Sequence, residues 1–122
     1  MIKTNKKYIE SLYPCETGKN NLYKKISVLG KTVEFDLLVA DFNDVIWFLT
    51  QSEIGKNVIS DILLKYHESL QDNQYKRKVY RIMIRFNSNN NMENLFILNK
   101  NDNNFENFFK TECNNLNISL TN

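Results

Sequence analysis

The sequence predicts an α+β fold, a two-layer sandwich in which a mostly antiparallel sheet from two β-hairpins has helices packed on it. Apolar and polar residues alternate in two paired stretches, 22–40 and 75–99, as they do in hairpins. Between these stretches, apolar residues recur three or four apart over 41–70, as in amphipathic helices. Because 122 residues suit one compact domain, we expect a single α+β domain over 1–122 with the order α-ββ-α-ββ-α-β.

The first elements follow from local signals. Residues 4–12 are expected to form a short helix capped by Thr4 or Asn5, which Pro14 ends because the residue before a proline leaves the α region. The stretch 22–40 is a hairpin whose Gly30-Lys31 turn has glycine first, as a type II′ turn requires. This turn separates apolar from polar cross-strand pairs, which are Val28–Val33 and Ile26–Phe35 on one face, and Lys25–Asp36 and Ser27–Glu34 on the other.

The stretch 41–70 is predicted to be helical, with a bend or a break between two consecutive helices. Asp41 or Asn43 can cap the first turn, and Ser52 can cap a second segment. The phase of the apolar residues shifts near Thr50–Glu53, with Gly55 close by, which is why we expect the bend there. The apolar positions of the second segment are Ile54, Val58, Ile59, Ile62, Leu63, Tyr66 and Leu70.

The stretch 75–86 is predicted to be a strand, and it contains every arginine of the chain. Side chains of a strand alternate with period two, so Arg77, Arg81 and Arg85 project from one face over about 26 Å. The opposite face is a core wall of Tyr80, Ile82, Ile84 and Phe86.

A loop at 87–91 would join this strand to a second one at 92–99, which places Arg85 opposite Glu93. The face with the arginines would also carry Val79, Met83, Leu95 and Ile97. Asp102 is expected to cap a helix that runs to about Cys113, followed by a short strand in which Leu116, Ile118 and Leu120 alternate with polar residues.

The net charge and the residue composition limit the functions that the chain can have. The net charge is only +2, but it is uneven: +5 over 1–31, −6 over 32–73, +5 over 74–86 and −2 over 87–122. Such asymmetry acts on association more than on the fold. The abundance of asparagine and lysine is typical of a low-GC bacterial or phage coding sequence.

The compartment follows from two further observations. No apolar run approaches the ~20 residues that span a bilayer, and the N-terminal residues lack the apolar stretch of a secretory signal. We therefore expect a cytoplasmic protein. Cys15 and Cys113 are too few for a disulfide scaffold or, with one histidine, for a zinc site, so we expect free thiols, with a disulfide as the alternative.

The three arginines, here called the arginine row, are the sharpest functional signal. Only arginine, and not the more abundant lysine, binds carboxylate or phosphate bidentately. The row can face a binding partner, either an acidic protein or a nucleic-acid backbone. Alternatively, it can form a cross-strand ion-pair ladder in which Glu93, Glu34 and Asp36 take part.

Other candidates are weaker. His67, the only histidine, could act as an acid or base, but a solvated residue near a helix end explains it better. Trp47 is expected in the core, with partial exposure as the alternative because Phe48 competes for the same face. We predict no catalytic, metal or cofactor site. The predicted partner-binding residues are Arg77, Arg81, Arg85, Met83, Asp41, Asp44, Glu53 and Trp47.

Three functions remain open. The first is a small non-enzymatic binding protein of the inhibitor or immunity type, which docks on a protein partner such as a toxin or nuclease through the arginine sheet face or its acidic helical segment. The second is a nucleic-acid-binding module or small ribonuclease, in which the arginine row holds phosphates, Tyr75 or Tyr80 stacks on a base and His67 is the acid or base. The third is a homodimer that buries the arginine face.

Overall fold

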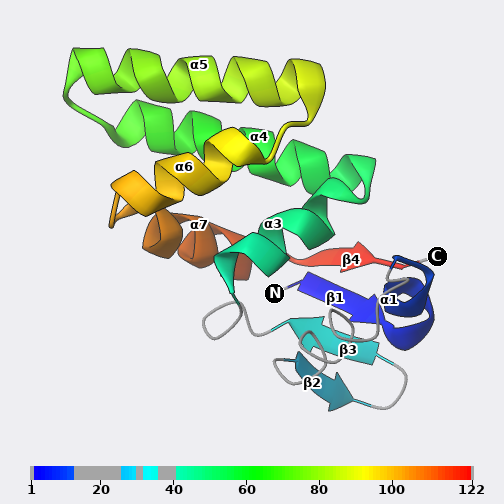
Figure 1. The fold of residues 1–122 in the computed structure, drawn as a ribbon. Coiled ribbons are helices and arrows are strands. Elements are labelled where there is room, and N and C mark those ends of the chain that lie inside the picture. Colours follow the sequence, from blue (N-terminus) through cyan, green and yellow to red (C-terminus); the bar gives the residue numbers. More distant parts are fainter. Residues whose placement is uncertain (1, 13–25, 30–31, 36–40, 122) are drawn as a thin grey trace. The chain divides into compact units, whose positions relative to one another are not determined.

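The computed structural model describes residues 2–12, 26–29, 32–35 and 41–121. The chain divides into two compact units, one of Met1–Val45 with Lys110–Asn122 and one of Ile46–Phe109. Within the described ranges there are six helices and four short strands, so the protein is mostly helical (Figure 1). The predicted two-layer α+β sandwich built from two hairpins is therefore wrong. A single domain over 1–122 stays a prediction.

The first unit contains a small sheet. Its strands have the order β2-β3-β1-β4, in which β1 is antiparallel to β3 and parallel to β4 (Figure 1). The bounds of the elements in this unit are β1 Ile2–Asn5, α1 Lys6–Leu12, β2 Ile26–Leu29, β3 Thr32–Phe35 and β4 Ile118–Leu120.

The register of the first hairpin is confirmed. Ile26 pairs with Phe35, Ser27 with Glu34 and Val28 with Val33. The expected pair of Lys25 with Asp36 and the Gly30-Lys31 turn lie outside the described residues. Asn5 does cap the N-terminal helix, because its Oδ1 accepts a hydrogen bond of 2.7 Å from the Tyr8 amide. The strand β1 just before that helix was not predicted.

The second unit is helical. Helix α3 (Phe42–Thr50) begins in the first unit and ends in the second, α4 is Glu53–Ser69, α5 is Asn73–Asn89 and α6 is Glu93–Asn101. Helix α7 (Phe105–Asn114) begins in the second unit and ends in the first. The predicted break between two helices near Gly55 and the helix after Asp102 are confirmed.

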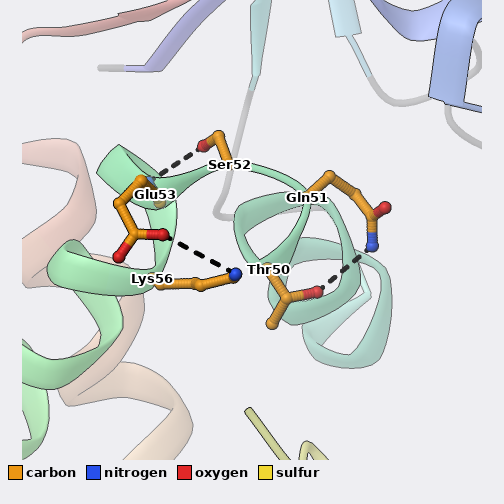
Figure 2. Close-up of polar contacts among 6 residues, drawn as sticks. Thr50, Gln51, Ser52, Glu53 and Lys56 are labelled. Carbon is orange, nitrogen blue, oxygen red and sulfur yellow. Dashed lines mark hydrogen bonds and ion pairs between the residues drawn. The ribbon is translucent and has the colours of Figure 1, made fainter. Parts of the chain in front are cut away.

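Ser52 starts α4 as predicted. Its Oγ accepts a hydrogen bond of 3.0 Å from the amide of Gly55, which satisfies one of the free donors of the first turn (Figure 2). The next residue, Glu53, forms an ion pair of 3.7 Å with Lys56, one turn further along the helix (Figure 2). Two residues earlier, Gln51 donates a side-chain hydrogen bond to Thr50 (Figure 2).

The predicted second hairpin is wrong, because its two strands are the helices α5 and α6. Asp72 caps α5 by accepting hydrogen bonds from the amides of Gln74 and Tyr75. Asn90 ends it in the left-handed conformation, with φ 54°, and its amide donates to the carbonyl of Phe86. The loop predicted at 87–91 thus overlaps the connection between α5 and α6, which joins two helices and not two strands.

The helical period decides which side chains of α5 are buried. Val79, Ile82, Met83 and Phe86 lie three or four residues apart and are buried, and α4 packs alongside α5 (Figure 1). Tyr80 and Ile84, which the strand prediction placed in the core, are 44 % and 46 % exposed. Of the four residues of the predicted core wall, Ile82 and Phe86 are therefore in the core, whereas Tyr80 and Ile84 are not.

No helix in the described part of the chain is both long enough and apolar enough to cross a membrane.

Candidate functional site

The arginine row runs along the solvent side of α5. Arg77, Arg81 and Arg85 are all exposed, and a four-residue spacing turns each by only ~40° from the last. Eight residues at a rise of ~1.5 Å place Arg77 and Arg85 about 12 Å apart along the axis, not the ~26 Å of a strand. The row is therefore a compact basic surface on one helix.

Within the described part of the chain, the three guanidinium groups have no acidic partner. Among the described residues, no ion pair involves Arg77, Arg81 or Arg85. The predicted cross-strand ladder is wrong, because Glu93 is the first residue of α6 and no second hairpin exists to bring it opposite Arg85. Guanidinium groups without an internal acidic partner can bind a carboxylate or phosphate from outside the chain.

One flank of the row meets α4. The ring of Tyr80 lies 5.4 Å from that of His67, and Ser60 of α4 donates a hydrogen bond to Asn87 of α5. These two contacts fix α4 and α5 antiparallel, so Leu64 and Ile84 lie between them along the seam. Leu64 is 40 % exposed, and with Tyr80 and Ile84 it forms an apolar strip beside the arginine row.

A pocket of about 290 Å³ opens at the end of this strip. His67, Arg77, Tyr80 and Arg81 line it, and we call it the His67 pocket. The Nδ1 atom of His67 lies 3.0 Å from the carbonyl oxygen of Lys76, which orients the ring. If Nδ1 donates to that carbonyl, Nε2 is the nitrogen that can accept a proton.

The other flank of the row meets α6. A pocket of about 200 Å³ lies there, which we call the α5–α6 groove. Its lining residues are Lys78, Arg81, Ile82, Arg85, Asn94, Ile97 and Leu98. Arg81 thus lines pockets on both flanks, which makes it the central residue of the basic surface.

A buried-hydroxyl cluster, the Asp102 cluster, ties the helices of this unit together. The Oδ2 atom of Asp102 accepts hydrogen bonds from the hydroxyls of Tyr66 on α4 and Tyr75 on α5, the latter at 2.6 Å. Burial, and then the hydrogen bond to Asp102, raises the pKa of both phenols. Burial also acts to raise the pKa of Asp102, but hydrogen bonds from both phenols and two backbone amides outweigh it and lower that pKa.

The remaining predicted partner-binding residues are spread over both units. Met83 is buried in the core of the helical unit. Asp41 and Asp44 belong to the first unit, at the start of α3. Glu53 is paired with Lys56 on the first turn of α4. Trp47 is half-buried, whereas its neighbour Phe48 is buried, so Phe48 takes the core position.

Several residues of the surface were missed from the sequence. On a strand, Lys78 would lie opposite the arginines, because period two separates it from Arg77 and Arg81, whereas on a helix it lies one turn from Arg81. The contribution of Asn94 depends on how α6 packs against α5, and no local signal carries that, whereas Ile97 was expected beside the arginines and does line the α5–α6 groove. The available signal was the spacing of Val79, Ile82, Met83 and Phe86, which is helical.

The described residues hold no group of three or more His, Cys, Asp or Glu side chains that could bind a metal ion. Comparison of the chain with protein-family models, curated proteins and solved structures gave no match.

Proposed function

We propose that this chain is a small non-enzymatic binding protein, of the inhibitor or immunity type, which docks on an acidic surface of another protein through the arginine row. The observation that carries the proposal is the exposed, unpaired state of Arg77, Arg81 and Arg85 among the described residues. Charges that no internal partner compensates favour association with a surface of opposite sign.

The apolar strip beside the row supports a protein partner. Leu64, Tyr80 and Ile84 are each 40–46 % exposed and lie next to the arginines. Tyrosine and arginine are enriched among the residues that dominate protein–protein binding energy, and aliphatic contacts around them exclude water. A phosphate backbone has no apolar groups that could pack against these aliphatic side chains.

A cytoplasmic location belongs to the same proposal. Cys113 is buried and forms no disulfide, and burial raises the pKa of its thiol to about 12. An inert free thiol fits a reducing compartment.

The test is affinity capture from cells of the source organism with the immobilised protein. We expect a stoichiometric protein partner whose binding weakens about a hundredfold when Arg77, Arg81 and Arg85 are all replaced by alanine, because a loss of ~1 kcal/mol for each arginine sums to about two factors of ten. Replacing the same three arginines by lysine keeps the charge but removes the planar guanidinium that binds a carboxylate bidentately, so we expect an intermediate loss of affinity. Lys100→Ala, on an exposed lysine of α6, is the background control.

Capture of no stoichiometric partner, or of one that binds the triple alanine variant as well as the natural chain, contradicts the proposal. Raising the ionic strength should weaken the complex, because exposed charges are screened over ~10 Å at 0.1 M salt.

A ribonuclease is the second candidate, and the His67 pocket favours it. The pocket brings together one acid or base, two arginines for phosphate and one aromatic ring for stacking. If the chain cleaves RNA, His67→Asn abolishes cleavage of a labelled single-stranded RNA, whereas Ser60→Ala on the same flank does not. Absence of cleavage by the natural chain removes this candidate.

A further inference from the structure

The α5–α6 groove differs in kind from the rest of the arginine row. Its α5 wall carries three cations, Lys78, Arg81 and Arg85, and its α6 wall carries Asn94 and Ile97. The other two lining residues are aliphatic and buried, since Ile82 is 8 % and Leu98 is 2 % exposed. One wall is therefore cationic, while the rest of the groove is mainly aliphatic.

The charge in the groove has no counterpart within it. No acidic side chain lines it, and among the described residues Lys78 and Arg85 take part in no ion pair. Three cations that lie within two turns of one helix repel each other, and an anionic group between them relieves that repulsion. The groove is thus complementary to an anion.

The aliphatic lining decides between classes of anionic partner. Single-stranded nucleic acids bind on basic grooves whose aromatic rings stack with the bases, and no aromatic residue lines this groove. Ile97 is 47 % exposed and offers a contact for an aliphatic side chain.

We propose that the α5–α6 groove binds an acidic segment of a protein partner in which carboxylate side chains alternate with aliphatic ones. The carboxylates contact Lys78, Arg81 and Arg85, and an aliphatic side chain packs on Ile97 above Leu98. This inference rests on the proposed function, because it names the chemistry of the partner at one part of the same surface.

The experiment is fluorescence anisotropy with the full chain and a short labelled peptide of alternating glutamate and leucine. We expect Lys78→Ala and Arg85→Ala each to weaken peptide binding about tenfold, the loss of one charge-assisted hydrogen bond. Lys100→Ala is the control, because Lys100 is an exposed cation of α6 that does not line the groove, and it should change binding less than about twofold.

A second pair of measurements tests the aliphatic contact. Ile97→Gln should weaken binding of the glutamate–leucine peptide but leave that of poly-glutamate unchanged. Ile97 is exposed, so this variant is expected to fold, which circular dichroism checks.

Three results would overturn the inference: no binding of the peptide, equal losses for Lys100→Ala and Arg85→Ala, or tighter binding of oligo-deoxythymidine than of the peptide with the same dependence on Lys78 and Arg85. The result also separates from that of the proposed function. If a partner is captured and its binding depends on the arginine row, but the peptide does not bind, only the inference about the groove is refuted. A peptide that binds as expected with no captured partner removes the proposed function instead.

Discussion

Replacing Gly55 by alanine is expected to destabilise the helical unit severely, although the same change in most helices is stabilising. A Cβ atom on Gly55 would lie 2.0 Å from the carbonyl oxygen of Leu49 and 2.8 Å from its Cα. Both atoms are backbone at the end of α3, so no side-chain rotation can make room. The corner between α3 and α4 would have to open.

We expect Gly55→Ala to lower the free energy of unfolding by about 3 kcal/mol, at the upper end of the usual cost of overpacking. This is a large part of the ~5–15 kcal/mol that stabilises a typical domain, and it should lower the melting temperature by roughly 10 °C. Thermal unfolding followed by circular dichroism measures it. Asn57→Ala, at an exposed position of the same helix, is the control and should change stability little. An unchanged or higher melting temperature for Gly55→Ala would contradict the close approach.

Replacing Asp102 by alanine is expected to destabilise the same unit through a different mechanism. The carboxylate accepts hydrogen bonds from Tyr66 and Tyr75, and its other oxygen accepts one of 2.9 Å from the amide of Asn104. Its removal leaves two phenols without their acceptor, that of the buried Tyr66 and that of the half-buried Tyr75. We expect a loss of about 2 kcal/mol in urea unfolding at neutral pH, since hydrogen bonds to a charged acceptor contribute ~1.5–3 kcal/mol and water replaces part of them here.

The pH dependence of this loss identifies the carboxylate as its source. The hydrogen bonds lower the pKa of Asp102 in the folded chain below its usual value near 3.8, so its contribution is complete above that pH and disappears as the pH falls through the folded-state pKa. The pKa of each phenol is raised instead, so the tyrosine contribution is complete below about pH 10 and falls above it.

The difference in unfolding free energy between the natural chain and Asp102→Asn should therefore be constant from about pH 5 to pH 9 and shrink below pH 4. Asp61→Asn, on the exposed side of α4, is the matched control for a general charge effect. If the two variants show the same pH profile, the hydrogen bonds of Asp102 are not the cause.

The sequence was sufficient where a single local signal decided the structure. Ser52 has both the side chain of a cap and a long amphipathic helix after it, so the start of α4 was predictable. The hairpin register followed from one turn and from the separation of apolar and polar pairs. The strand β1 was missed because Ile2–Asn5 is short and pairs only with strands distant in sequence.

The stretch 75–99 was mispredicted because two periods fit the same residues. Tyr80, Ile82 and Ile84 alternate as in a strand, while Val79, Ile82 and Met83 follow a helical spacing. The β-branched and aromatic residues favoured the strand, but Asp72 as a cap and the several Lys and Arg residues favour the helix that forms. The prediction that the three arginines share one face is still correct, because residues four apart lie on the same side of a strand and of a helix. The α5–α6 groove could not be predicted, since it depends on the packing of two elements.

The arginine side chains themselves give the most direct test of the binding surface. The chain contains three arginines, and all of them are in the row, so the Nε–H region of a nitrogen-15 NMR spectrum holds one signal for each. On titration with the captured protein partner, we predict that the signals of Arg77, Arg81 and Arg85 all shift and that they do so less at high salt. Unshifted arginine signals in a complex that perturbs backbone signals elsewhere would contradict the claim that this face of α5 binds the partner.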